Sequence, residues 1–233
     1  MARRMQRAKI EKNIGYTFRD GALLERAFTH PSAGAHVRDN YQNLEFLGDS
    51  VLGFIVARKL FTLYSDSDEG ALTKMRACVV SEAPLARAVD RLDIASELMV
   101  GEGERKHAVH NHAGVKCDLF ESLTAAIYLD GGFEAAEKFV LTALSEDIAS
   151  AKTTARLVDS KSRINEYAMK KGVSAEYREE GRTGAVHEPV FTFSLYLGGE
   201  KAGEGCGGSK RAAQQAAAAD ALAKLERTKK QKK

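Results

Sequence analysis

The segment from Asn43 to Ile55 constrains the fold of this chain more than any other part of the sequence. Its residues are apolar on nearly every side of a helix, yet the segment carries two acids, Glu45 and Asp49. Residues four positions apart project from one side of a helix, so these carboxylates are expected one turn apart. An unpaired buried carboxylate is costly. We therefore expect a buried helix with a positive group between its acids.

A second segment, residues 117–129, repeats this pattern with Asp118 and Glu121 in an apolar run. Two such helices facing each other would bring four carboxylates together, as in the metal sites of helical bundles. Oxygen ligands with no histidine or cysteine at metal spacing favour Mg²⁺ or Mn²⁺ over zinc. Either pair alone is weak evidence, because paired surface acids are common.

A cluster of this kind is suited to in-line displacement at a phosphodiester. One metal ion would make a hydroxide nucleophile, and a second, roughly 4 Å away, would stabilise the leaving oxygen. The phosphate of the substrate would complete the coordination. The predicted chemistry is therefore metal-dependent hydrolysis of a phosphate ester.

The chain is expected to form two domains joined by a linker. Apolar residues recur at three- and four-residue spacing over 21–148, which predicts an all-helical domain within 1–150. Residues 151–158 lose apolar density and are predicted to be the linker. A small domain over 159–228 and a frayed basic tail over 229–233 follow.

The periodicity after the linker changes from helix to strand. The expected elements are a short helix capped by 159–160, strands at 175–180, 189–197 and 201–206, and an alanine-rich helix from 209 to about 226. The predicted fold class is an all-α domain followed by a small α+β domain of order α-β-β-β-α.

Charge divides between the two domains. Residues 159–233 hold 15 Lys and Arg against 10 Asp and Glu, which leaves 20 against 22 for residues 1–158. A basic C-terminal domain suggests a polyanionic partner, whereas the acidic excess before it suggests carboxylates gathered for another purpose.

Several functional classes are excluded by what the sequence lacks. It has no stretch of about 18 apolar residues and no signal-peptide core, so we expect a cytoplasmic protein without membrane contact. The three cysteines are far apart, which argues against disulfides and a zinc site; reduced, mostly buried thiols are expected. The six histidines are expected to be structural or at the surface, apart from His187, which is considered below.

The run N-L-E-F-L-G-D-S-V-L at 43–52 resembles the signature of bacterial ribonuclease III. Residues 14–18, 27–32 and 118–130 also resemble segments of that family, and the likeness extends from about residue 10 to 226. The resemblance implies catalytic roles for Asp49 and Glu121. It implies a metal site made by Glu45, Asp118, Glu121 and Asp49, holding Mg²⁺ with Mn²⁺ as a substitute, and no small-molecule cofactor.

The resemblance also assigns roles to three residues outside this set. Glu69 matches a family acid near the cleavage site, although it could equally be a helix-start carboxylate favoured by the helix dipole. Gln42 departs from the glutamate that many members carry, which puts cleavage-site preference in doubt because an amide adds no charge for a metal. Phe46 falls at the family's dimer contact, with a core phenylalanine as the alternative.

The activity implied is endonucleolytic cleavage of double-stranded RNA by a homodimer whose paired sites cut both strands. The ends would be 5′-phosphate and 3′-hydroxyl with short 3′ overhangs, and the substrates rRNA precursors and other structured transcripts. The alternative is a non-catalytic dimeric regulator that binds duplex RNA. A phosphohydrolase for small nucleotides is disfavoured by the appended domain.

The C-terminal domain resembles the double-stranded-RNA-binding domain. Lys210 and Arg211 at a helix start suit phosphates, because side-chain charge adds to the helix dipole. The polar residues expected to contact 2′-hydroxyls in the minor groove are Asn165, Glu166 and His187. Gln214 stands where the family often has lysine, so lower phosphate affinity is expected. The alternative for the Ser-Lys-Arg start is an ordinary solvated cap.

Overall fold

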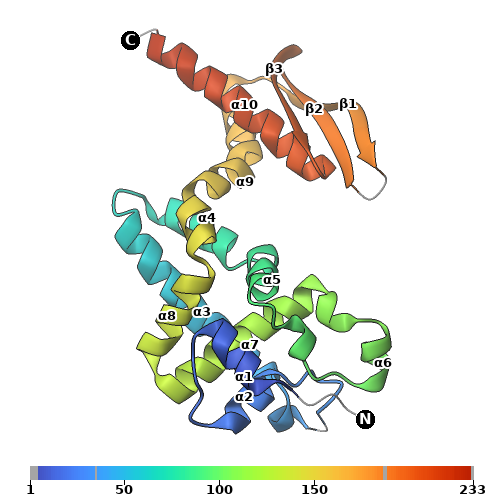
Figure 1. Ribbon diagram of the computed structural model, residues 1–233. Helices are drawn as coiled ribbons and strands as arrows, with labels where there is room; N and C mark the ends of the chain where they lie inside the picture. The colour runs from blue at the N-terminus through green and yellow to red at the C-terminus, as the bar shows by residue number, and fades with distance from the viewer. Residues whose placement is uncertain (1–4, 35, 186–187, 232–233) are drawn as a thin grey trace. The chain divides into compact units, whose positions relative to one another are not determined.

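The computed structural model describes residues 5–34, 36–185 and 188–231 (Figure 1). The chain forms two compact units, Met1–Ala151 and Lys152–Lys233. The first unit is helical, as predicted. Its α-helices are α1 (Arg7–Ile14), α2 (Gly21–Ala27), α3 (Gln42–Leu63), α4 (Glu69–Val79), α5 (Glu82–Arg91), α6 (Glu102–Lys106), α7 (Ala113–Gly131), α8 (Phe133–Ala143) and the start of α9 (Ser145–Lys171). Three short 3-10 turns, η1 (Val37–Asp39), η2 (Ala95–Glu97) and η3 (Val109–Asn111), lie between them.

Helices α3 and α7 pack against each other through the centre of the first unit. Both are apolar on most sides, and their buried side chains include Leu52 and Ile55 from α3 and Phe120 from α7. At Gly48 the two backbones nearly touch, because a Cβ placed there would lie 1.9 Å from the carbonyl oxygen of Glu121. Only glycine fits at this crossing. The crossing therefore fixes which residues of the two helices face each other.

The second unit is an antiparallel three-stranded sheet in the order β1-β2-β3, made by Ala175–Ala185, Glu188–Leu197 and Glu200–Gly207. Helix α10 (Lys210–Gln231) packs on β2 and β3. The contact is close, since a Cβ at Gly205 would lie 2.3 Å from the backbone nitrogen of Ala217. The core residues are Ile164, Phe193, Leu195, Ala213, Ala217, Ala218 and Ala221. The predicted α-β-β-β-α order is confirmed.

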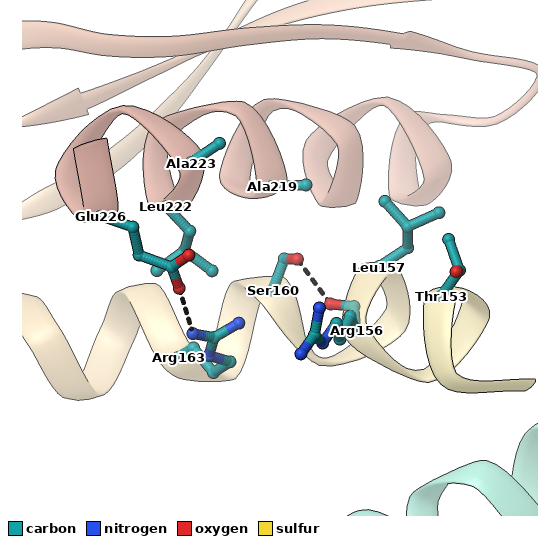
Figure 2. A pocket seen from close by; sticks show the side chains of 9 residues that line it. All are labelled: Thr153, Arg156, Leu157, Ser160, Arg163, Ala219, Leu222, Ala223 and Glu226. Carbon is teal, nitrogen blue, oxygen red and sulfur yellow. Dashed lines mark hydrogen bonds and ion pairs between the residues drawn. The ribbon is translucent and has the colours of Figure 1, made fainter. Parts of the chain in front are cut away.

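The predicted boundary at residues 150–151 agrees with the division into two units, but the linker is helical and the helix expected to begin at 159–160 begins earlier. Residues 151–158 lie inside the continuous helix α9, and the boundary between the two units falls within that helix. Ala151 and Ala155 are buried on one face of α9. The scarcity of large apolar residues in this segment therefore did not mark the end of a helix. Ser160, expected as a cap, instead donates a hydrogen bond to the carbonyl oxygen of Arg156 at 2.7 Å (Figure 2).

The last helix is longer than predicted. It continues through Gln231 instead of ending near Glu226, so residues 229–231 are helical and not a frayed tail. The Arg163 guanidinium of α9 bonds the Glu226 carboxylate at 3.0 Å, which ties the two helices together near this end (Figure 2). None of the described helices is long and apolar enough to cross a membrane.

Gly48→Ala should lower the free energy of unfolding by about 1–3 kcal/mol, because the added methyl forces α3 away from α7. Chemical denaturation measures this loss. Gly114→Ala, at the start of α7, is the matched control, since its Cβ would lie 3.9 Å from the nearest atom. Equal stability of the two variants would contradict the close crossing.

Candidate functional site

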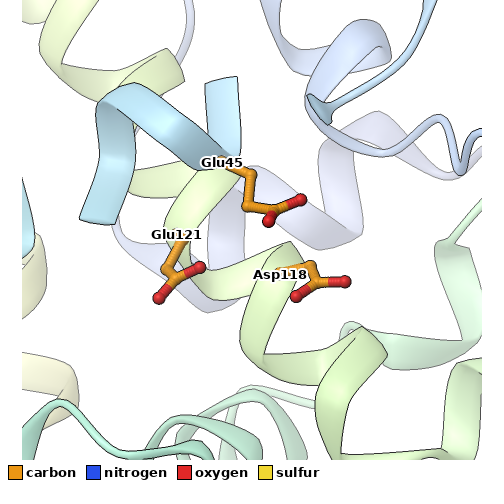
Figure 3. A group of neighbouring side chains, drawn as sticks. All are labelled: Glu45, Asp118 and Glu121. Carbon is orange, nitrogen blue, oxygen red and sulfur yellow. The ribbon is translucent and has the colours of Figure 1, made fainter. Parts of the chain in front are cut away.

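Three carboxylates meet where α3 and α7 cross. Glu45, from α3, and Asp118 and Glu121, from α7, each offer an oxygen within 4.8 Å of the others (Figure 3). All three side chains are partly buried. Positions 118 and 121 are three apart and therefore share one face of α7. The sequence prediction that acids from two helices converge is correct for these three residues.

Asp49 does not join this group and its side chain is exposed, so the expected convergence of four acids in an apolar interior is wrong. Helix geometry accounts for part of the difference. At about 100° per residue, Glu45 lies about 60° and Asp49 about 100° to the same side of Gly48, so Asp49 is about 40° further from the contact with α7 and one turn along the helix. Asp49 still acts on the site, because its charge contributes to raising the pKa of Glu121.

Electrostatic repulsion and burial make the three carboxylates hard to ionise together. Burial, and then the charges of Asp49, Asp118 and Glu45, raise the pKa of Glu121 from 4.5 to about 7. The pKa values of Glu45 and Asp118 are also raised, in each case mainly by burial. Three oxygen donors that repel one another fit a hard divalent cation, which would neutralise them. The cluster is the candidate metal centre.

Two side chains that touch the acids were missed by the sequence analysis. The hydroxyl of Tyr41 donates to Oδ2 of Asp118 at 3.1 Å, and Tyr41 is only 2% exposed. The Sγ of Cys117 lies 3.8 Å from Oε1 of Glu121. Cys117 precedes Glu121 by four positions, about one helical turn, so the sequence spacing could have predicted their contact. Tyr41 and Asp118 are 77 positions apart, and no local sequence pattern predicts that they meet.

A histidine treated as structural also belongs to the surroundings of this site. The rings of His30 and Tyr41 meet edge to face, with centroids 5.7 Å apart. Burial lowers the pKa of His30, while the charges of Glu104 and Asp118 act in the opposite direction. His30 therefore contributes to the shell that fixes Tyr41.

The other residues predicted for the nuclease domain lie outside the acid cluster. Gln42 is the exposed first residue of α3, and Glu69 is exposed at the first turn of α4. Phe46 is 79% exposed, which rules out the alternative that it is a core residue. Glu69 helps to line a cavity of about 620 Å³ together with Phe54 and Phe61 of α3.

The residues predicted to contact RNA lie in the second unit. Asn165 and Glu166 are exposed on α9, and Lys210 and Arg211 are exposed at the start of α10. The helix begins as expected, since the backbone nitrogen of Ala212 donates to Oγ of Ser209 at 3.2 Å.

Gln214 and His187 were also predicted to contact RNA. Gln214, one turn into α10, is partly buried. His187 lies outside the described residues, so its placement stays a prediction.

The raised pKa of Glu121 predicts a pH-dependent stability in metal-free protein. The folded state keeps a proton that the unfolded chain releases above pH 4.5, so stability from this group is present at low pH and is lost as the pH rises through about 7. Glu121→Gln should therefore raise the free energy of unfolding by about 1–3 kcal/mol at pH 8 and by less at pH 5. Chemical denaturation in EDTA at both values measures this.

Glu134→Gln, which changes an exposed carboxylate on α8, is the control and should have little effect at either pH. A gain of the same size at pH 5 and pH 8 for Glu121→Gln would contradict a raised pKa at this position.

Comparison with known proteins agrees with both domains. A family model described as ribonuclease-III-like matches residues 20–148, and one described as the double-stranded RNA binding motif matches residues 160–225. Both matches lie within the two units that the structure separates.

Curated relatives cover nearly the whole chain. Ribonuclease 3 of Sinorhizobium medicae is 41% identical over 91% of this chain and 89% of its own length. Ribonuclease 3 of Symbiobacterium thermophilum is 39% identical over 93% of each chain. A crystal structure of the nuclease domain of ribonuclease III from Campylobacter jejuni has a TM-score of 0.58 and 31% identity, covering 61% of this chain and 95% of that domain. The chain belongs to the ribonuclease III family.

Proposed function

We propose that this chain is an endoribonuclease that hydrolyses phosphodiester bonds in both strands of double-stranded RNA, using Mg²⁺ held by the acid cluster. The observation that carries the proposal is the meeting of Glu45, Asp118 and Glu121 from two separate helices within 4.8 Å. Structured transcripts such as rRNA precursors are the substrates this function implies. The products would carry 5′-phosphate and 3′-hydroxyl ends with short 3′ overhangs.

The residues around the cluster have distinct roles in this proposal. Glu45, Asp118 and Glu121 hold Mg²⁺, or Mn²⁺ in its place, and Tyr41 fixes one oxygen of Asp118. A bound divalent ion supplies Lewis-acid activation of water and neutralises charge at the phosphate. Asp49 is exposed beside Glu121, so it lies on the side that RNA and water reach.

Glu121 makes cation binding at this site dependent on pH near neutrality. Its pKa of about 7 in the metal-free protein means that a proton and a cation compete for the same carboxylate. A cation bound by Glu121 would displace that proton and lower the repulsion among the acids. Gln42 and Glu69 lie outside the cluster and are assigned to contacts with the RNA around the cleavage site.

An apolar face on α3 supports a homodimer. The exposed fractions of Phe46, Phe54 and Phe61 are 79%, 60% and 70%. Their separations of eight and seven residues place them along one side of the helix. Aromatic side chains exposed on this scale mark interfaces. One of the Campylobacter jejuni structures concerns a region involved in dimer formation of that nuclease domain. Two copies would supply one active site for each RNA strand.

Asp118→Asn and Glu121→Gln should each reduce Mg²⁺-dependent cleavage of a duplex RNA by at least about 100-fold, since each removes a charged oxygen donor worth several kcal/mol. Binding of the same RNA in EDTA should stay within about twofold of wild type. Asp49→Asn should likewise impair cleavage and spare binding. Glu134→Gln is the control with normal cleavage.

The same assay decides between an enzyme and a regulator. Wild-type protein that binds the duplex and leaves it intact with both Mg²⁺ and Mn²⁺ would overturn the nuclease proposal. It would favour a dimeric RNA-binding regulator instead.

Phe46→Glu should raise the dimer dissociation constant at least about tenfold, because a charge replaces an apolar contact at the interface. Analytical ultracentrifugation over a dilution series measures this. Met169→Glu, at a residue that is 84% exposed in the second unit, is the control and should leave the dimer intact. An unchanged dissociation constant for Phe46→Glu would show that this face of α3 does not form the dimer contact.

A further inference from the structure

A lysine of α9 reaches the first turns of α10. The Nζ of Lys161 donates to Oε1 of Gln214 at 2.6 Å. Its backbone nitrogen donates to Oε1 of the adjacent Gln215 at 3.0 Å. The same ammonium group lies 4.7 Å from the ring centroid of Tyr177 on β1, within the range of a cation–π interaction. Contacts with α10 and β1 therefore fix where this positive charge lies, and the bond to Gln215 holds the backbone of Lys161.

The charge lies beside the two exposed cations that begin α10. Gln214 follows Lys210 by four positions and Arg211 by three, so all three side chains are neighbours on the helix surface. Since Lys161 bonds Gln214, its ammonium is within about one helical turn of Lys210 and Arg211. The positive end of the helix dipole adds to the potential there.

Lys161 keeps hydrogen-bonding capacity for a ligand. An ammonium group has three N–H donors. Gln214 accepts one, and the Tyr177 ring attracts the charge from another side. The side chain of Lys161 is only partly buried, so solvent and ligands can reach the group.

The identity of residue 214 follows from this arrangement. A lysine at 214 would place a second ammonium at hydrogen-bond distance from Lys161, where like charges repel. The neutral amide of Gln214 instead accepts a hydrogen bond and orients the cation that is already present. The absence of lysine at this position of α10 therefore does not remove positive charge from the surface.

We propose that Lys161 contacts an RNA phosphate and supplies, from α9, the cation that α10 lacks at position 214. The phosphate-binding surface then spans Lys161, Lys210 and Arg211, with Gln214 and Tyr177 as the residues that position Lys161. The proposal rests on duplex-RNA binding by this domain. It makes no use of the metal centre.

Fluorescence anisotropy with a labelled duplex of about 20 base pairs, longer than the roughly 16 that such a domain spans, tests this. Full-length protein is titrated in EDTA, which prevents cleavage, at several KCl concentrations. Lys161→Met keeps the aliphatic stem over Tyr177 and removes the charge. The slope of log Kobs against log[KCl] should become shallower by about 1, and affinity should fall severalfold at each salt concentration. The double variant Lys161→Met with Gln214→Lys should restore the slope.

Lys224→Met is the matched control, because it also removes one positive charge, at a position of α10 about 15 Å along the helix from Gln214. Its slope should equal that of wild type. Lys161→Gln, which keeps a hydrogen bond to Gln214, replaces Lys161→Met if thermal melting shows that the latter is unfolded.

An unchanged slope in a folded Lys161 variant would overturn the proposal and leave Lys161 as a structural link between α9 and α10. Wild-type protein that fails to bind the duplex would instead count against RNA binding by the domain as a whole.

Discussion

The backbone contact between α3 and α7 at Gly48 is the constraint on which the active site depends. The carbonyl oxygen of Glu121 occupies the space of a side chain at position 48, so the two helices approach more closely than any other residue would allow. That approach places Glu45 opposite Asp118 and Glu121. Packing and chemistry therefore share one crossing, and the apolar residues around it hold the acids at a fixed separation.

The acid cluster destabilises the metal-free protein and favours the binding of a cation. Partial burial raises the pKa values of all three carboxylates, and the charges of neighbouring acids add to this at Glu45 and at Glu121, whose pKa rises to about 7. The cost would disappear if the acids pointed into water, as Asp49 does. Instead Tyr41, itself buried, donates a hydrogen bond to Asp118 and orients one of its oxygens. A rigid, electrostatically unfavourable cluster is a preorganised site for a divalent ion.

Sequence periodicity was sufficient for the helices that carry the acids, because the apolar runs around Glu45 and Glu121 are too long for strands. It failed where spacing alone cannot determine orientation. Asp49 follows Glu45 by one turn on the same side of α3, yet it lies about 40° further from Gly48 and is exposed, which the four-residue spacing did not predict. The residues 151–158 looked like a linker because their buried side chains include small alanines. Contacts such as Tyr41 with Asp118 depend on tertiary structure and leave no local pattern.

Anomalous scattering from crystals grown with Mn²⁺ tests most directly whether the crossing of α3 and α7 builds a divalent-metal site. We expect an anomalous peak about 2 Å from carboxylate oxygens of Glu45, Asp118 and Glu121. Ordered side chains at these positions with no peak between them, or with their carboxylates directed apart into solvent, would contradict it.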